Sequence, residues 1–295
     1  MQTEDVIIIG VGPAGIATAI QLKRYGIVPL LLEKNETGGL LRNANLVENY
    51  PGFPGGISGL ALVNLFEKQL AENSIRVIFE ETTELDLKDN LFTVATSRRV
   101  YYSRIMVVAS GTKPKKSGIS EAAEEVKDKI FYEVYPLLKV KGKKIVIVGA
   151  GDAAFDYALN LAKNNEVVIL NRSRTTKCLP LLRERVELAP SSSYREDTEI
   201  LRITSISPTD MLLECSSPGG ISKLDAHYLV FAVGREPQLD FLSERLKVNA
   251  RKMEDRGVLY FVGDVKNGVF RQTAIAVGDG IMTAMKIYEK LKAEG

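Results

Sequence analysis

The most prominent feature of the hydrophobic and polar pattern along this chain is a set of short apolar runs, some of them followed by glycine and then by a helical pattern. Residues 6–9, 143–148 and 166–170 are rich in valine and isoleucine, and residues 16–24 and 156–163 place apolar side chains at helical spacing. Runs of β-branched residues without alternation are typical of strands buried on both faces of a parallel sheet. The pattern therefore predicts repeated strand–turn–helix units and an α/β fold.

Two further apolar runs indicate how the chain divides into domains. Residues 105–109 and 229–233 are strand-like, and a polar segment that contains a proline follows each of them. Such segments are typical of linkers, and 295 residues are enough for two domains. We therefore expect residues 1–115 and 233–295 to form one domain, and residues 116–232 to form a second domain inserted into it.

The remaining segments are interpreted in the same way. Residues 194–206 and 211–215 predict strands of a meander inside the insert, and the serines at 191–193 predict a loop. Near the end of the chain, residues 259–264 predict a strand ending in Gly-Asp, and residues 276–291 predict a helix. An acid at the end of a parallel strand lies where ligands bind in such sheets.

The turn after the first predicted strand, GVGPAG (10–15), carries candidate chemistry. Gly10 permits the tight turn, and Gly12 lets the backbone approach a pyrophosphate. Gly15 permits close packing of the helix on the strand, and the N-terminus of that helix stabilises phosphate charge. The next apolar run ends in Glu33, where an acid accepts a hydrogen bond from a ribose 2′-hydroxyl. This complete unit predicts a dinucleotide site.

A second unit, GAGDAA (149–154), follows the apolar run that begins at residue 143. Its ribose position has no acid and is occupied by Asn171, Arg172 and Arg174, with Lys177 nearby. A guanidinium attracts a 2′-phosphate and a carboxylate repels it, which favours an NADP site; the alternative is a set of solvated loop charges. Two dinucleotides in one chain point to hydride transfer between a nicotinamide and a flavin.

Composition excludes several classes of function. The 39 basic and 37 acidic residues leave a formal charge of +2, which gives no electrostatic argument for nucleic acid or a membrane surface. The two cysteines, Cys178 and Cys215, form no CxxC pair, and the single histidine, His227, leaves no cluster for a metal. The sequence shows no signal peptide pattern and no apolar run of spanning length, so we expect a cytoplasmic protein.

The motifs together resemble those of the low-molecular-weight thioredoxin reductases, across nearly the whole chain. The matching segments are GVGPAG (10–15), GG (38–39), ENYPGFPGGISG (48–59), ASGT (109–112), GAGDAA (149–154), VGD (262–264) and RQTAIAVGDG (271–280). The resemblance implies two Rossmann-like domains of three layers, one inserted in the other. It further implies FAD in the first domain, NADPH in the second, a homodimer, and a swivel about the two linkers.

The motifs and the resemblance assign two groups of cofactor-binding residues. Those for FAD are Gly10, Gly12, Pro13, Ala14, Gly15, Glu33, Lys34, Gly39, Leu40, Asn49, Ala109, Ser110, Gly111, Gly263, Asp264, Arg271, Gln272, Thr273 and Ala274. Those for NADP are Gly149, Gly151, Asp152, Ala153, Asn171, Arg172, Arg174, Lys177 and Gly234. By the resemblance, Asn49 lies near the flavin and Asp264 binds its ribityl chain.

The sequence departs from that family where the family carries its redox-active CxxC. Tyr132 and Tyr135 occupy the two cysteine positions, and tyrosine cannot exchange a disulfide. The loop NRSRTTK (171–177) matches the family's 2′-phosphate pattern only in part, so NADH remains an alternative to NADPH. Asp152 and the segment that follows it also resemble ferredoxin–NADP reductases of the thioredoxin reductase type.

Three functions are compatible with these observations. The first is an FAD-dependent NAD(P)H oxidoreductase that passes electrons to ferredoxin or flavodoxin, a quinone, another small molecule or oxygen. The second is a regulatory flavoprotein with little turnover. The third is a thioredoxin reductase whose cysteines have moved to Cys178 and Cys215. We favour the first, because each cysteine lies in a different predicted element and has no vicinal partner. Tyr132 and Tyr135 either stack near the cofactors or fill space between domains.

Overall fold

The computed structural model describes residues 3–115 and 124–294. Residue 116, where the sequence begins the inserted domain, lies outside the described residues. The chain divides into two compact units. Unit 1 contains the residues up to Arg42, Val47–Lys113 and the residues from Glu236 onward, and unit 2 contains Asn43–Leu46 and Pro114–Arg235.

Unit 1 is built on a seven-stranded sheet. Its strands are β1 (Thr3–Ile9), β2 (Leu30–Glu33), β3 (Val77–Phe79), β4 (Thr82–Lys88), β5 (Leu91–Thr96), β6 (Val100–Val108) and β17 (Leu259–Phe261). The order β3-β2-β1-β6-β17 is parallel throughout, and β5 and β4 extend β6 in antiparallel pairing. Ile7 lies opposite Leu30 on one side and Met106 on the other, which places the predicted apolar run at the centre of the sheet.

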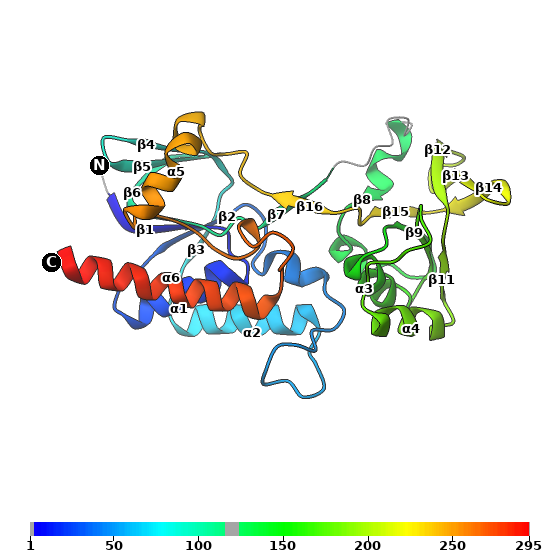
Figure 1. The fold of residues 1–295 in the computed structure, drawn as a ribbon, viewed down its shortest axis with the longest axis horizontal. Coiled ribbons are helices and arrows are strands. Elements are labelled where there is room, and N and C mark those ends of the chain that lie inside the picture. Colours follow the sequence, from blue (N-terminus) through cyan, green and yellow to red (C-terminus); the bar gives the residue numbers. More distant parts are fainter. Residues whose placement is uncertain (1–2, 116–123, 295) are drawn as a thin grey trace. The chain divides into compact units, whose positions relative to one another are not determined.

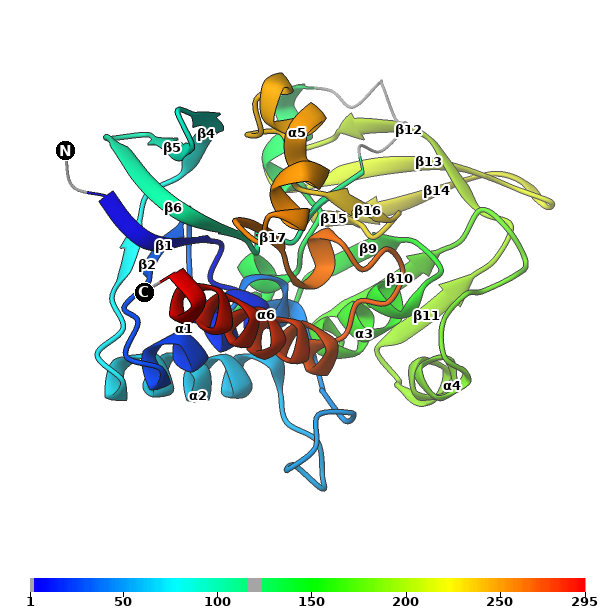
Figure 2. The ribbon, with the colours of Figure 1, turned by 60° about the vertical axis from the view of Figure 1, so that its left-hand side comes forward.

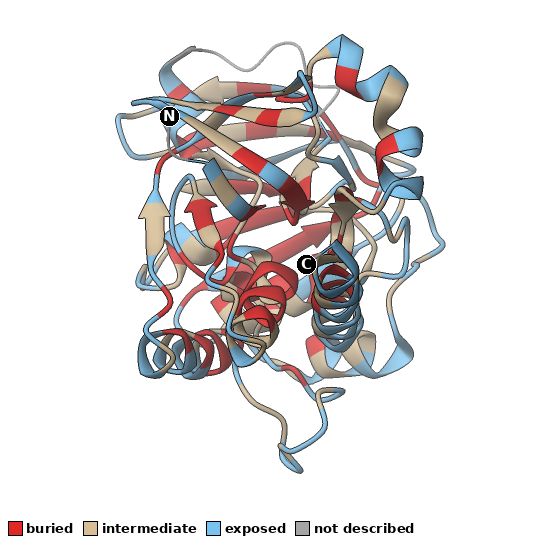
Figure 3. Cartoon of the chain, turned by 90° about the vertical axis from the view of Figure 1, so that its left-hand side faces the viewer, coloured by how far each residue is buried: buried red, intermediate tan, exposed pale blue. Residues whose placement is uncertain are grey.

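The helices of unit 1 complete its layers. Helices α1 (Pro13–Arg24), α2 (Gly59–Glu72) and α6 (Thr273–Glu294) lie along the sheet in Figures 1 and 2, and α5 (Glu244–Asp255) packs against β4 and β17. Ile7, Met106 and Leu246 share one buried cluster, which joins the sheet to α5. Burial concentrates in the central strands and on the sheet-facing sides of the helices (Figure 3). Short 3₁₀ turns, η1 (Gly39–Asn43) and η4 (Gly263–Val265), border the candidate site.

Unit 2 has a parallel sheet of order β11-β10-β9-β15-β8 between helices and a meander. Its elements are β8 (Ile130–Phe131), β9 (Lys144–Val148), β10 (Glu166–Leu170), β11 (Ser192–Arg195), β15 (Tyr228–Phe231), α3 (Asp152–Leu161), α4 (Pro180–Leu188), β12 (Glu199–Ser205), β13 (Met211–Ser217), β14 (Gly220–Ala226), η2 (Glu124–Lys129) and η3 (Tyr135–Leu137). Ile145 packs with Phe155 of α3, whereas its neighbour Val146 packs with Met211 of the meander. This alternation gives three layers and confirms the predicted Rossmann-like fold.

Two local predictions in unit 2 were wrong. The serine run is not a loop, because Ser192 and Ser193 belong to β11, the edge strand of the parallel sheet. Residues 194–206 are not one strand of the meander, because the chain leaves β11 at Arg195 and starts β12 at Glu199 in a different sheet. The strand β11 forms through its parallel pairing with β10, which the polar composition of its residues does not reveal.

The two linkers pair with each other. Strands β7 (Thr112–Pro114) and β16 (Arg235–Pro237) form a separate two-stranded sheet. The boundaries of the units fall after Lys113 and after Arg235. The sequence places them after residues 115 and 232.

A short segment of unit 2, Asn43–Leu46, comes from the part of the chain that otherwise builds unit 1. The Asn43 Oδ1 accepts hydrogen bonds from the backbone N–H groups of Val134 at 3.0 Å and Tyr135 at 2.9 Å. The Asn45 N–H donates to the Asp156 carboxylate of α3 at 2.8 Å. Burial raises the pKa of Asp156 to about 6, although this hydrogen bond and one from the Leu46 N–H oppose the shift.

Candidate functional site

The glycine turn of unit 1 joins β1 to α1 with a backbone that side chains would obstruct. Gly10 has φ of +99°, in the left-handed region, and a Cβ there would lie 2.4 Å from the Ala109 carbonyl oxygen. A Cβ on Gly15 would lie 2.0 Å from the Gly10 carbonyl oxygen. Glycine at these two positions therefore lets α1 pack directly against the turn.

The middle glycine of the turn has a different role. Gly12 has extended backbone angles, φ −81° and ψ −177°, and a Cβ there would meet nothing within 4 Å. The fold itself therefore does not require glycine at this position. Open space beside the N-terminus of α1, with Pro13 as its first residue, fits the path of a pyrophosphate and hence FAD.

Glu33 lies at the carboxyl end of β2, beside this turn. Its Oε2 accepts a hydrogen bond from the Val11 N–H at 2.9 Å, and its Oε1 accepts one from the Asn35 N–H at 3.1 Å. These bonds hold the carboxylate at the edge of the sheet and leave lone pairs for ribose hydroxyls. The geometry fits the dinucleotide site predicted from the sequence.

Further predicted FAD residues lie at the same edge of the unit 1 sheet. Ala109, Ser110 and Gly111 follow β6, and the Ser110 hydroxyl donates to the Gln238 carbonyl at 2.7 Å. Gly39 and Leu40 lie in η1, and Lys34 is exposed after β2. Asn49 Nδ2 donates to Gln272 Oε1 at 3.0 Å, which links two predicted residues that are 223 positions apart.

The start of α6 faces η4. Gly263 has φ of +73° and donates its N–H to the Asp279 carboxylate at 3.1 Å. Asp264 lies in η4, Arg271 and Gln272 precede α6, and Thr273 and Ala274 begin it. Asp279, which the sequence analysis did not select, also accepts from Asn267 Nδ2 at 2.7 Å and therefore holds this turn together. Its position in GDG (278–280) of the last matching motif was the available signal.

Unit 2 repeats the glycine turn between β9 and α3. Gly149 has φ of +153°, and a Cβ there would lie 2.5 Å from the Ala232 carbonyl oxygen. A Cβ on Gly151 would meet nothing within 4 Å, as at Gly12. Ala154 takes the third position and is fully buried. The open space at Gly151 fits the pyrophosphate of a second dinucleotide.

Two hydrogen bonds connect this turn to the loop that follows β10. The Lys177 N–H donates to the Ala150 carbonyl at 2.7 Å, and the Leu179 N–H donates to Asp152 Oδ1 at 2.7 Å. Asp152 and Ala153 begin α3, so these bonds hold the predicted pyrophosphate and ribose regions together. Gly234, with φ of +112°, lies in the linker before β16.

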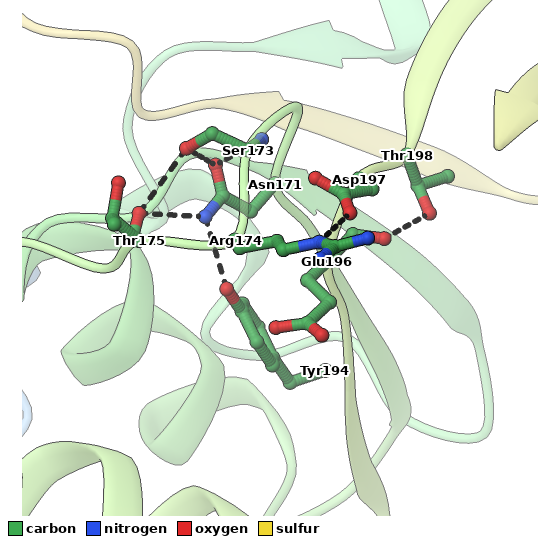
Figure 4. Close-up of polar contacts among 8 residues, drawn as sticks. All are labelled: Asn171, Ser173, Arg174, Thr175, Tyr194, Glu196, Asp197 and Thr198. Atoms are coloured by element: carbon green, nitrogen blue, oxygen red, sulfur yellow. Dashed lines mark hydrogen bonds and ion pairs between the residues drawn. The ribbon is translucent and has the colours of Figure 1, made fainter. Parts of the chain in front are cut away.

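Asn171 organises the ribose loop from inside (Figure 4). Its Nδ2 donates to the Thr175 carbonyl at 3.0 Å and to the Tyr194 hydroxyl at 2.9 Å, and its Oδ1 accepts from the Ser173 N–H at 3.2 Å. The side chain is buried, so its part in the structure is to shape the loop. Contact between Asn171 and a cofactor stays a prediction.

The basic residues of the loop differ in their surroundings. Arg172 and Lys177 are exposed, and Arg172 forms no ion pair with the described residues. Arg174 donates from Nε to Asp197 Oδ2 at 2.6 Å. That carboxylate, followed by Glu196, raises the pKa of the Arg174 guanidinium. A pocket of about 450 Å³ lies between α4 and the β11 segment and is lined in part by Tyr194 and Glu196.

Tyr132 and Tyr135 lie within unit 2. The Tyr132 ring packs against Phe231, with ring centroids 5.9 Å apart. Tyr135 begins η3, and its N–H donates to Asn43 Oδ1. These contacts lie inside unit 2, whereas the sequence analysis expected the two rings either near the cofactors or between the domains, so their role stays a prediction.

The two cysteines contact opposite faces of the unit 2 sheet. Cys178 packs at the cluster that contains Val167, and Cys215 belongs to the cluster that contains Val168. Adjacent strand residues point to opposite faces, so the sheet separates the two thiols. Cys215 is 1% exposed, and burial raises the pKa of its thiol. The two thiols therefore cannot form a disulfide with each other in this fold.

The single histidine contacts a backbone N–H and an acid of unit 2. His227 Nδ1 accepts from the Lys144 N–H at 3.0 Å, and its Nε2 lies 3.4 Å from Asp210. Within residues 3–115 and 124–294, no group of three or more metal-ligating side chains comes together. None of the helices in those ranges combines the length and apolar character needed to cross a membrane.

Known proteins resemble the chain over nearly its whole length. A profile of the pyridine nucleotide-disulphide oxidoreductase family matches residues 4–280. A thioredoxin reductase of Streptomyces coelicolor is 30% identical over 295 residues, which cover 95% of this chain and 92% of that protein.

Two solved structures share the fold. Lactococcus lactis thioredoxin reductase in its FR conformation has a TM-score of 0.84 at 23% identity, covering 98% of this chain and 99% of that one. The bacillithiol disulfide reductase Bdr of Staphylococcus aureus has a TM-score of 0.72 at 19% identity, covering 100% and 99%. These comparisons confirm the resemblance to thioredoxin reductases that the motifs indicate.

Proposed function

Because the chain belongs to the pyridine nucleotide-disulphide oxidoreductase family, we propose that it is an FAD-dependent NAD(P)H oxidoreductase without a redox dithiol of its own. FAD, when bound, supplies the two-electron chemistry that connects the nicotinamide to an acceptor. The observation that carries the proposal is the pair Tyr132 and Tyr135 at the positions where thioredoxin reductases have cysteines. The separation of Cys178 and Cys215 by the unit 2 sheet supports it further.

In this proposal unit 1 binds FAD. The turn at Gly12 leaves room for the pyrophosphate, and Glu33 accepts hydrogen bonds from the adenosine ribose. Residues at the ends of β6 and β17 and at the start of α6 border the isoalloxazine end. The N-terminus of α6 stabilises negative charge there.

Unit 2 binds the nicotinamide coenzyme in the same way. The Gly151 turn receives the pyrophosphate, and Arg172 contacts a 2′-phosphate, which gives NADPH the advantage over NADH. No side chain of the protein is required as an acid or base, because the alignment of the two cofactors determines the rate. We further propose a cytoplasmic homodimer.

The acceptor, in this proposal, meets the reduced protein directly. Candidates are a small redox protein such as ferredoxin or flavodoxin, a quinone, another small molecule, or oxygen. A low-molecular-weight disulfide is a further candidate, because the similar Staphylococcus aureus structure is named a bacillithiol disulfide reductase.

The test is anaerobic reduction of the FAD-loaded protein by NADPH, followed by a panel of acceptors. Rapid bleaching of the flavin, followed by turnover with ferricyanide, a quinone or ferredoxin, is expected. The double variant Cys178→Ala, Cys215→Ala is the matched control and should keep that turnover. Absence of bleaching would favour the regulatory flavoprotein, and thioredoxin reduction that disappears in the double variant would restore a dithiol mechanism.

A further inference from the structure

Two acids lie beside the ribose loop of unit 2, at the carboxyl end of β11. Glu196 and Asp197 follow the last residue of this strand, and the Asn171 N–H donates to the Arg195 carbonyl at 2.9 Å, which holds the two segments together. Asp197 has φ of +45°, a left-handed conformation that aspartate and asparagine tolerate better than most residues. This turn directs its carboxylate to Arg174 (Figure 4).

The acids change the charge that a ligand meets at this edge. Arg172, Arg174 and Lys177 bring three positive charges, and Glu196 and Asp197 bring two negative charges. Arg174 is engaged by Asp197 at 2.6 Å, whereas Arg172 has no ion-pair partner within the described ranges. A phosphate that approached Arg174 would compete with the carboxylate for the same guanidinium and would be repelled by it.

We propose that Asp197 determines coenzyme specificity: its carboxylate holds Arg174 and limits the preference for NADPH over NADH. Arg172 is then the guanidinium that reads the 2′-phosphate. A neutral 2′-hydroxyl is indifferent to this competition, so Asp197 disfavours NADPH without affecting NADH. The inference rests on the proposed nicotinamide site in unit 2, and it assigns Asp197 a positioning role, since the carboxylate acts through Arg174.

The expected change in phosphate affinity follows from the solvent exposure of the Arg174–Asp197 ion pair. The Arg174 side chain is 77% exposed and that of Asp197 is 25% exposed. Ion pairs this accessible to solvent are weak, so removal of the competing carboxylate should strengthen phosphate binding by about 2- to 5-fold. The effect should shrink as salt screens the charges.

The test measures binding of 2′,5′-ADP and 5′-AMP to the FAD-loaded protein by calorimetry, because neither probe requires turnover. Asp197→Asn keeps a residue that tolerates positive φ and removes the charge. It should bind 2′,5′-ADP about 2- to 5-fold more tightly than wild type and leave 5′-AMP unchanged. Arg174→Ala should weaken 2′,5′-ADP binding, because it leaves the Asp197 carboxylate uncompensated. The double variant should return towards the wild-type ratio.

Asp225→Asn, an exposed acid of β14, is the matched control for a general change in charge and should leave both affinities unchanged. If Asp197→Asn binds both probes with the wild-type ratio, Asp197 does not set specificity and the inference is wrong. An equal gain in the Asp225→Asn variant would likewise overturn it. If the wild type binds neither probe, the nicotinamide site itself fails, which contradicts the proposed function.

Discussion

Unit 1 and unit 2 contain the same glycine turn, which starts at Gly10 in unit 1 and at Gly149 in unit 2. Counted from these first glycines, the two copies differ at the same two positions. The first two glycines of each turn have the same surroundings in both units. A Cβ on the first glycine would clash with a backbone carbonyl oxygen, whereas a Cβ on the second would meet nothing within 4 Å. The third position is glycine in unit 1 and Ala154 in unit 2. Twenty-three residues after the first glycine (33 − 10 and 172 − 149), unit 1 has Glu33 and unit 2 has Arg172.

The comparison distinguishes the residues that the turn needs for its backbone conformation from the residues that each proposed ligand needs for binding. The shared features fit the pyrophosphate that FAD and NADPH, the two proposed ligands, both contain. The third position sets how closely the helix approaches the turn, and α3 accepts a methyl group where α1 does not. The ribose position carries opposite charges, which fits a free 2′-hydroxyl in unit 1 and a 2′-phosphate in unit 2.

The largest expected effect comes from Gly12→Val and Gly151→Val. Neither new side chain meets protein atoms near its Cβ, so both variants should fold. Gly12→Val should lower FAD affinity by about 100-fold or more and give colourless protein, because the side chain occupies the path of the pyrophosphate. Gly151→Val should stay yellow but lose NADPH binding. Flavin absorbance and coenzyme titration measure both results, and a yellow Gly12→Val protein would contradict the assignment of unit 1.

The second largest effect should come from substitutions at the third position, which should lower the stability of the two units by different amounts. Gly15→Ala places a Cβ 2.0 Å from a backbone oxygen, so we expect a loss of about 3 kcal/mol in unfolding free energy. The reverse change, Ala154→Gly, should cost about 1 kcal/mol, through the lower helix propensity of glycine. Chemical denaturation of the two variants checks the difference. Equal losses would show that the two helices approach their turns equally closely.

The ribose positions should give a smaller effect. Arg172→Ala should weaken NADPH binding by about tenfold and leave NADH binding unchanged, because one exposed charge-assisted contact to phosphate is removed. Lys139→Ala, a basic residue outside the ribose loop, provides a control for the loss of positive charge. Equal use of both coenzymes by wild type and variant would mean that Arg172 does not read the phosphate.

The smallest effect concerns pH. Seven residues after the first glycine, α1 has the buried Ala17 and α3 has Asp156, whose pKa burial raises to about 6 from its ordinary 3.8. The folded state therefore binds this proton more tightly than the unfolded chain does, and Asp156 contributes stability as the pH falls from about 6 to about 4.

Asp156→Asn should therefore be about 1 kcal/mol more stable than wild type at pH 7, and the gain should disappear near pH 4. Hydrogen exchange of the α3 amides at several pH values measures this difference. A gain that is independent of pH would show that the Asp156 carboxylate is not the group that titrates.

The sequence predicted the parts of the fold that depend on local pattern. Runs such as residues 6–9 and 167–170 are apolar because both faces of a parallel strand are buried, so they could be recognised without tertiary information. β11 could not, because Ser192 and Ser193 are polar and the strand exists through its pairing with β10. The β-propensity of a residue carries little information where pairing with a neighbouring strand determines the structure.

The candidate site was predictable to a similar extent. Glycine spacing located both turns, since Gly10, Gly15 and Gly149 lie where a Cβ would clash with a backbone oxygen. The ion pair of Arg174 with Asp197 could not be predicted, because the residues are 23 positions apart and meet only through the pairing of β10 with β11. The contact of Asp279 with Gly263, 16 positions away, could not be predicted for the same reason, although the GDG motif (278–280) marked the position of Asp279.

The segment Asn43–Leu46 has a consequence for the order in which the protein is synthesised and folds. Its contacts with unit 2 span 91 residues to Val134 and 111 residues to Asp156. The segment therefore leaves the ribosome long before its partners exist, and the Val134 and Tyr135 N–H groups of unit 2 depend on a piece of chain made much earlier. A contact that closes so large a loop has a high entropic cost and forms slowly. We expect unit 2 to be completed late, and a separately expressed fragment 114–235 to expose the backbone donors that Asn43 satisfies.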